Sequence, residues 1–140
     1  MAETWLLYAL LSMLFAGLTA VLAKFGLQQI NADLGLAVRT AVIFGFVGIN
    51  TLLGKSWRDW PALTPKQLLF LVLSGLATTL SWVCYYRAMK AGPVSYVAAI
   101  DKGSIVVTLL LSAWWLGEPL TPKLLLGGGL IVTGLLVLLG

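Results

Sequence analysis

The sequence predicts an all-α membrane protein with five transmembrane helices, and three observations support this fold class. Hydrophobic residues make up 60% of the 140-residue chain and charged residues only 10%, against about 25% charged residues in soluble domains. The hydrophobic residues gather in five segments of roughly 18–23 residues, the length that an α-helix needs to cross about 30 Å of hydrocarbon. Short polar connections separate these segments, so consecutive helices should be antiparallel neighbours.

The segments form one predicted domain over residues 1–140, because the chain is too short for a second compact unit of this kind. Helices are expected rather than strands, since backbone groups in lipid must be hydrogen-bonded within the segment. The first segment follows no basic region and is expected to be retained as a membrane helix, not removed as a signal peptide. The predicted helices cover about residues 5–25, 34–53, 67–89, 94–116 and 122–139.

The helix boundaries are supported by local signals in the connections. Thr64 and Thr121 each precede a proline, the pattern of an N-cap followed by proline at the first helical position. Trp57 and Trp60 lie in the longest connection, where their amphipathic rings are suited to the membrane interface.

Asp101 and Lys102 are adjacent charges in the middle of the fourth apolar segment. A charge near the centre of a membrane helix costs about 3 kcal/mol on insertion scales, so such residues usually face protein, water or a substrate path. The pair therefore indicates a polar interior. The alternative is that Lys102 snorkels to the interface and that Asp101 only fixes helix packing.

Helix alternation places most charges of the apolar segments toward one membrane face. The basic members, Lys24, Arg39, Arg87, Lys90 and Lys102, outnumber Asp33 and Asp101. This predicts a positive vestibule that attracts anionic or zwitterionic solutes or anionic lipid head groups. An ion pair of Asp101 with Arg39 or Lys24 remains an equally open interpretation.

Two other patterns concern helix packing and cavity lining. Small residues suited to close helix contact, within one chain or between the copies of a dimer, are Ser104, Thr108 and Ser112 in the fourth segment and Gly127 and Gly128 in the fifth. Trp82 and Tyr86 in the third segment could line a cavity for an amphipathic solute, or belong to an interfacial aromatic belt.

Composition argues against several classes of function. The chain has no histidine and a single cysteine, Cys84, so histidine-dependent triads and an intramolecular disulfide are excluded. No carboxylate cluster predicts a metal site, no phosphate loop predicts a nucleotide cofactor, and no basic block predicts nucleic-acid binding. We therefore expect neither an enzyme nor a cofactor.

Several motifs resemble the EamA module of the drug/metabolite transporter superfamily. The similarity rests on Tyr86–Ser95, Leu116–Thr121, Arg39 early in the second segment and a glycine-rich last helix. The stretch Ala99–Ser104 is similar to the short, five-helix bacterial and archaeal branch. Most members of the superfamily carry two such modules in tandem, whereas this chain has one.

The resemblance implies a small-molecule transporter of the inner (plasma) membrane that exports or exchanges metabolites or drugs and is driven by an ion gradient. Because an odd helix number inverts a second module, a single module implies an antiparallel homodimer, a ten-helix inverted-repeat bundle. Its substrate-binding or coupling residues would be Asp101, Lys102, Arg39, Lys24, Trp82 and Tyr86. The alternatives are a non-transporting membrane subunit or scaffold, and a lipid translocator.

The charge distribution gives a weak signal for orientation. The face with the N-terminus holds four basic residues, against five on the other face, or three when the deep Arg39 and Lys102 are omitted. Because basic residues in loops direct orientation, this balance predicts insertion both ways, with a single orientation set by Lys55, Arg58 and Lys66 as the alternative.

Overall fold

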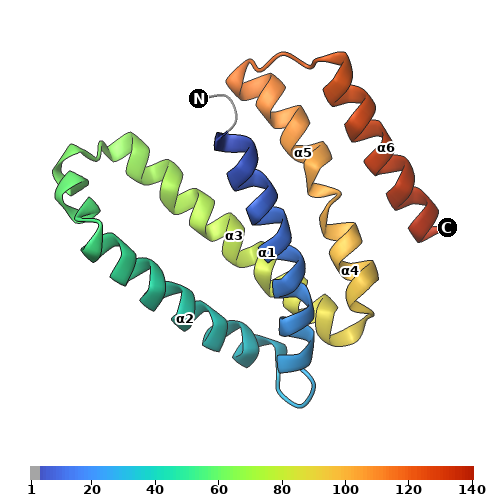
Figure 1. Ribbon diagram of the computed structural model, residues 1–140, viewed down its shortest axis with the longest axis horizontal. Coiled ribbons are helices and arrows are strands. Elements are labelled where there is room, and N and C mark those ends of the chain that lie inside the picture. Colours follow the sequence, from blue (N-terminus) through green and yellow to red (C-terminus); the bar gives the residue numbers. More distant parts are fainter. Residues whose placement is uncertain (1–3) are drawn as a thin grey trace. The chain divides into compact units, whose positions relative to one another are not determined.

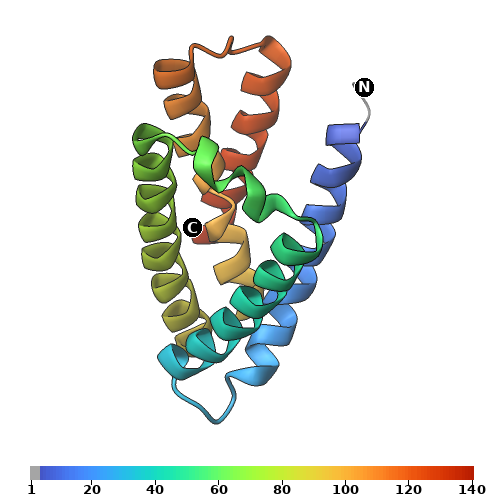
Figure 2. The same ribbon diagram turned by 90° about the vertical axis from the view of Figure 1, so that its left-hand side faces the viewer.

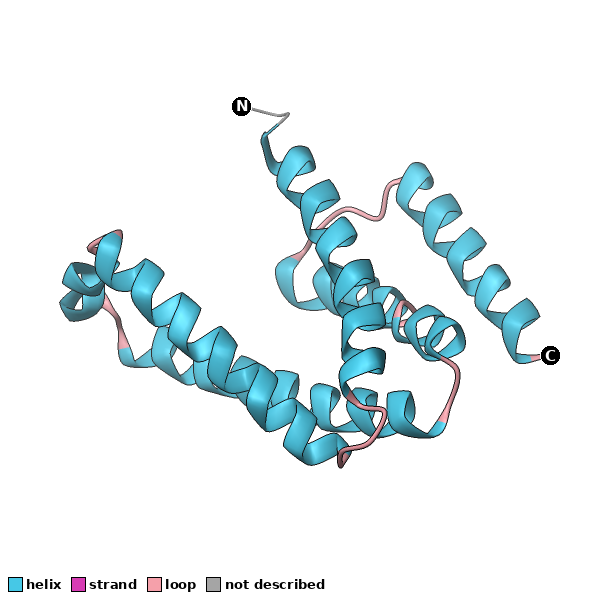
Figure 3. Cartoon of the chain, turned by 60° about the horizontal axis from the view of Figure 1, so that its bottom comes forward, coloured by secondary structure: helices cyan, strands magenta, loops and turns pink. Residues whose placement is uncertain are grey.

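The computed structural model describes residues 4–140, and every regular element in this range is helical (Figure 3). Five helical segments are long and apolar enough to cross a membrane, which confirms the predicted fold class. Their bounds are Thr4–Gly26, Ala32–Leu53, Pro65–Ala91, Val94–Leu116 and Pro122–Leu139.

Helices α1 (Thr4–Gly26) and α2 (Ala32–Leu53) are joined by a short polar turn. Asn31 is the N-cap of α2, and its side-chain oxygen accepts a hydrogen bond of 2.8 Å from the backbone N–H of Asp33. The acidic Asp33 lies in the first turn of α2, where the helix dipole favours a negative charge.

The connection from α2 to α3 (Pro65–Ala91) contains the short 3₁₀ helix η1 (Ser56–Ala62). At the start of α3 the Gln67 side chain accepts a hydrogen bond of 2.9 Å from the backbone N–H of Thr64, and the Thr64 hydroxyl accepts one of 3.3 Å from the Gln67 N–H. This reciprocal capping box satisfies two backbone donors and starts the helix at the position that Thr64 and Pro65 predicted.

The fourth membrane span is interrupted, although the sequence predicted one continuous helix. It consists of α4 (Val94–Asp101), α5 (Ser104–Leu111) and the π-helical turn η2 (Ser112–Leu116). At the interruption the N–H of Lys102 donates to the Ala99 carbonyl and that of Gly103 to the Ile100 carbonyl, at 3.0 and 2.8 Å. These i→i−3 bonds tighten the backbone into a 3₁₀ turn, which glycine permits more readily than most residues because it has low helix propensity.

The last helix, α6 (Pro122–Leu139), begins as predicted, with Thr121 as the N-cap. The Thr121 hydroxyl accepts a hydrogen bond of 3.3 Å from the backbone N–H of Leu124. Proline follows at the first helical position, where no intrahelical N–H is needed.

The helices pack in two compact units. One unit covers Val21–Ala91, and the other contains the described residues up to Ala20 together with Gly92–Gly140. In the first unit α2 and α3 form an antiparallel hairpin, joined at the end that carries η1 (Figure 1). In the second unit α6 packs against α4 and α5, to which a short loop connects it (Figure 2).

Buried side chains concentrate at the end of the first unit where α1 ends, α2 begins and α3 ends. Met89 is fully buried, and the others with less than a tenth of their surface exposed in this unit are Leu27, Ala32, Leu36 and Tyr86. Large apolar side chains cover most of the remaining helix surface, as expected where helices face lipid or other helices.

Candidate functional site

Arg39, on α2, lies over the rings of two aromatic side chains of α3. Its guanidinium carbon is 4.2 Å from the centre of the Trp82 ring and 5.7 Å from the centre of the Tyr86 ring. Trp82 and Tyr86 are four residues apart, so they lie on the same face of α3. Both rings therefore attract the arginine charge through cation–π interactions, and Tyr86 is almost fully buried beneath it.

A second arginine, Arg87 on α3, is paired with an acid. The Nε and Nη2 atoms of Arg87 donate hydrogen bonds of 3.2 and 3.1 Å to the two carboxylate oxygens of Asp33. This bidentate ion pair joins the end of α3 to the first turn of α2. Both side chains are more than half exposed, so the pair by itself adds little to the stability of the fold.

Lys24 and Lys90 connect the ends of α1 and α3 in a reciprocal way. The Lys24 ammonium group, on α1, donates a 2.6 Å hydrogen bond to the Met89 carbonyl in the last turn of α3. Lys90, on α3, donates hydrogen bonds of 2.6 and 2.9 Å to the Leu27 and Gln28 carbonyls just after α1. Each lysine thus satisfies carbonyl groups at the end of the other helix, where the helix dipole favours a cation.

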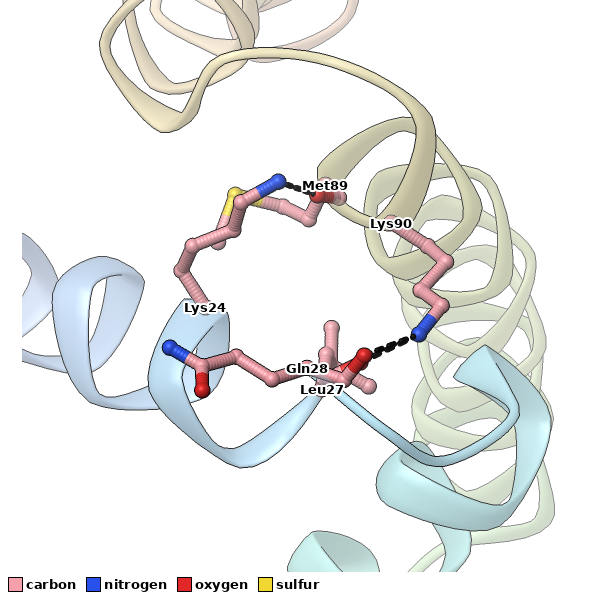
Figure 4. A pocket seen from close by; sticks show the side chains of 5 residues that line it. All are labelled: Lys24, Leu27, Gln28, Met89 and Lys90. Atoms are coloured by element: carbon pink, nitrogen blue, oxygen red, sulfur yellow. Dashed lines mark hydrogen bonds between the residues drawn. The ribbon is translucent and has the colours of Figure 1, made fainter.

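These two lysines border a cavity of about 240 Å³. Its lining consists of Lys24, Leu27, Gln28, Met89 and Lys90, and the two ammonium groups approach it from opposite sides (Figure 4). The cavity combines two cations, an amide and two apolar side chains, a lining suited to an anionic or zwitterionic group. Two members of the predicted positive vestibule thus border this cavity, and the vestibule itself stays a prediction.

Asp101 and Lys102 occupy the interruption of the fourth span, in the other unit. Asp101 is the last residue of α4, and its carboxylate lies 3.6 Å from the Lys102 ammonium group. The Asp101 side chain is 39% exposed and that of Lys102 63% exposed. The 3.6 Å distance shows that these two neighbouring residues form an ion pair with each other.

The residues proposed for helix packing behave differently from one another. Gly128 is buried, and a Cβ atom added there would lie 2.8 Å from Cδ1 of Leu109, whereas one at Gly127 would meet nothing within 4 Å. The hydroxyls of Thr108 and Ser112 donate to backbone carbonyls of their own span, those of Ser104 and Leu109.

Of the site residues predicted from the sequence, Arg39, Trp82 and Tyr86 lie together, and Lys24 lies in the same unit beside Met89. Sequence reasoning counted Lys90 in the positive vestibule but did not name Lys90 or Gln28 as a substrate-binding or coupling residue. Lys90 gave a partial signal, because a basic residue in the last helical turn often interacts with terminal carbonyls. The sequence could not show that these carbonyls belong to another helix, because that depends on tertiary packing.

Comparison with known proteins agrees with this architecture. The chain matches the EamA-like transporter family over residues 3–140. The chain belongs to the EamA family. It is also 41% identical over 138 residues to a Sinorhizobium sp protein described as an uncharacterized transporter in the cobO 3′ region, which covers 99% of this chain and 98% of that protein. No solved structure matches the chain.

Membership of the EamA family, together with five apolar helices, makes this chain a multi-pass membrane transporter. The family points to transport of small molecules across a lipid bilayer and not to catalysis. The similarity to the EamA module that the sequence motifs indicated is thereby confirmed.

Proposed function

We propose that this EamA chain carries a small molecule across the inner (plasma) membrane by alternating access, as an antiparallel homodimer. The observation that carries the proposal is the odd number of spans in a chain with a single module. Two copies inserted in opposite orientations form an inverted repeat, the arrangement in which many transporters expose a midplane site alternately to each side. The nearly equal numbers of basic residues on the two faces support insertion both ways.

The interrupted fourth span supports a role for Asp101 in coupling or substrate contact. Transporter sites commonly use helices that break within the membrane, because the break exposes charged side chains and backbone groups to the transport path. Asp101 ends α4, where the negative end of the helix dipole disfavours a second negative charge. A proton or a cation bound to the carboxylate relieves this repulsion, and Lys102 does so in part at 3.6 Å.

The experiment uses the purified full-length protein in liposomes on a solid-supported membrane. A panel of amino acids, carboxylates, ethidium and tetraphenylphosphonium is applied with and without a pH gradient, and transported charge is recorded. We expect a saturable current for at least one class, loss of it in Asp101→Asn, and its retention in Asp59→Asn. Asp59 is the matched control because it lies in η1, outside the spans.

A current of unchanged size in Asp101→Asn would refute the role of Asp101. Fluorescent phospholipids in the same liposomes test the lipid-translocator alternative through their accessibility to dithionite. Flipping of lipid without movement of any solute would replace the proposed function with that alternative. Neither solute nor lipid movement would favour a membrane subunit that works only with another protein.

A further inference from the structure

The arginine Arg39 differs from the other basic side chains at its end of the Val21–Ala91 unit. Arg87 holds Asp33 through two hydrogen bonds, Lys24 donates to Met89, and Lys90 donates to two carbonyls. Within this fully described unit, the contacts of Arg39 are instead the faces of Trp82 and Tyr86. Arg39 is therefore the basic side chain within a membrane span of this unit that is held by aromatic rings and has no acceptor for its N–H groups.

The aromatic contacts leave those N–H groups available. A guanidinium group interacts with an aromatic ring through its charge and its flat face, whereas its five N–H donors point outward in its plane. Arg39 is partly exposed. None of its side-chain nitrogen atoms is both buried and without a hydrogen-bond partner. The donors can therefore reach a ligand without first breaking a bond inside the unit.

The position of Arg39 makes an acceptor necessary. It lies two turns into α2, within a membrane span, and an arginine remains charged in proteins. An unpaired charge at this depth is unfavourable. Asp33, the acid in the first turn of the same helix, is already paired with Arg87 and is therefore not available to Arg39. A ligand with two oxygen atoms on one centre matches the planar fork of the guanidinium group.

We propose that Arg39, held by Trp82 and Tyr86, binds an oxyanion, a carboxylate or a phosphate ester, attached to an apolar or aromatic body. This inference names the substrate class of the transporter proposed above and rests on that function. The anion pairs with the guanidinium edge, and the apolar body lies against Trp82, which is partly exposed. A carboxylate solute and a phospholipid head group present the same chemistry, and the experiment separates them.

The solute arm measures equilibrium binding of benzoate to the full chain in dodecyl maltoside, which carries no charge, with neutral benzamide as the comparison ligand. We expect saturable benzoate binding and none of benzamide. Arg39→Gln should raise the Kd roughly 10- to 100-fold, the worth of charge-assisted hydrogen bonds. Arg39→Lys should keep only part of the wild-type affinity for benzoate. Trp82→Leu should weaken benzoate binding roughly 2- to 5-fold.

The lipid arm adds phosphatidylglycerol to the same micelles and counts bound lipids by native mass spectrometry. Lipid adducts that require Arg39, without benzoate binding, would support the oxyanion site with a head group as its ligand. Arg58→Gln is the matched control, because Arg58 also lies over a tryptophan, Trp57, at 5.6 Å, but in the connection between spans. It should leave both ligands bound as in the wild type.

Two results would overturn the proposal. One is that neither benzoate nor phosphatidylglycerol binds; the other is that Arg39→Gln and Arg39→Lys, while eluting and melting as the wild type does, bind both ligands unchanged. Because binding is measured without transport, failures of the two proposals are distinguishable. Binding at Arg39 with no solute movement would refute the transport function alone, and transport of cations or neutral solutes without oxyanion binding would refute this site alone.

Discussion

Lys24 and Lys90 cap each other's helices: the ammonium group of Lys24, on α1, binds the Met89 carbonyl of α3, and that of Lys90, on α3, binds the Leu27 carbonyl after α1. Among residues 4–140, Met89 and Leu27 are also the two most fully buried large side chains. The carbonyl groups at this helix junction are thus satisfied by charged donors next to its apolar core, where an unpaired polar group is costly.

The lysine caps should contribute measurably to stability. Lys24→Met and Lys90→Met keep an unbranched apolar stem but remove the donors, and each should lower the free energy of unfolding by about 1–2 kcal/mol. The double substitution should cost less than the sum, because both lysines fix the same junction. Unfolding in detergent measures the effect.

Lys66→Met provides the control for these variants, since Lys66 lies in the first turn of α3, at its opposite end, and is exposed. It should unfold as the wild type does. If all three lysine variants lose the same stability, the loss reflects a changed interaction with detergent. The hydrogen bonds of Lys24 and Lys90 would then not stabilise the helix junction.

The contact between Gly128 and Leu109 predicts a strong dependence on side-chain size. Gly128→Leu places a branched side chain where a Cβ atom alone comes within 2.8 Å of Leu109 Cδ1, and overpacking of this kind costs about 1–3 kcal/mol. Gly128→Ala should cost less, because the end of the Leu109 side chain can rotate away. Thermal unfolding in detergent measures both.

Gly127→Leu is the matched control, because a Cβ atom at Gly127 meets nothing within 4 Å. This variant should be as stable as the wild type or more so, since glycine is a poor helix former. Leu109→Ala should restore part of the stability lost in Gly128→Leu. Equal destabilisation by leucine at both glycines would argue against the α5–α6 contact.

The ion pair of Arg87 with Asp33 should respond to charge reversal. Asp33→Arg places like charges opposite each other, and Arg87→Asp does the same with the opposite sign, so each should lower the melting temperature. The double exchange restores an opposite-charge pair and should recover most of the loss. The recovery should shrink in 1 M salt, because both side chains are largely exposed. Additive losses at low salt would contradict the pairing.

The five spans and their starts could be predicted from the sequence because lipid imposes a simple requirement on length and polarity. Thr64 and Thr121 begin α3 and α6 as their sequence contexts indicated. The interruption after Asp101 was not predicted, because hydropathy cannot detect a change from i→i−4 to i→i−3 bonding. A glycine next to two charges was the available signal.

The arrangement of the candidate site could be predicted only in part. Trp82 and Tyr86 share a helix face by their spacing, so their joint position followed from periodicity. Their contact with Arg39 depends on the register between α2 and α3, which no local pattern contains. The same holds for Arg87, because which arginine takes Asp33 and which takes the rings is decided by tertiary packing.

Orientation is the property on which the proposed dimer depends. In a variant with Cys84→Ala and Gly140→Cys, a membrane-impermeant maleimide should label about half of the molecules from outside the cell, because the nearly balanced charges permit insertion both ways. Permeabilisation should make the rest reactive. Cys84 must be replaced because it is a free, exposed thiol.

Biasing the charge should then separate the two orientations and test whether both are needed. Glu118→Lys adds positive charge to the face of the N-terminus, and Gln29→Lys adds it to the other face. Each variant should therefore insert in a single orientation, and the orientations of the two variants should be opposite. Neither variant alone should transport, since two copies in the same orientation cannot form an inverted repeat. Co-expression of the two should restore transport, because each supplies the orientation that the other lacks. Full activity of either variant alone, once labelling at residue 140 shows a single orientation, would exclude the antiparallel dimer and favour a transporter of parallel copies.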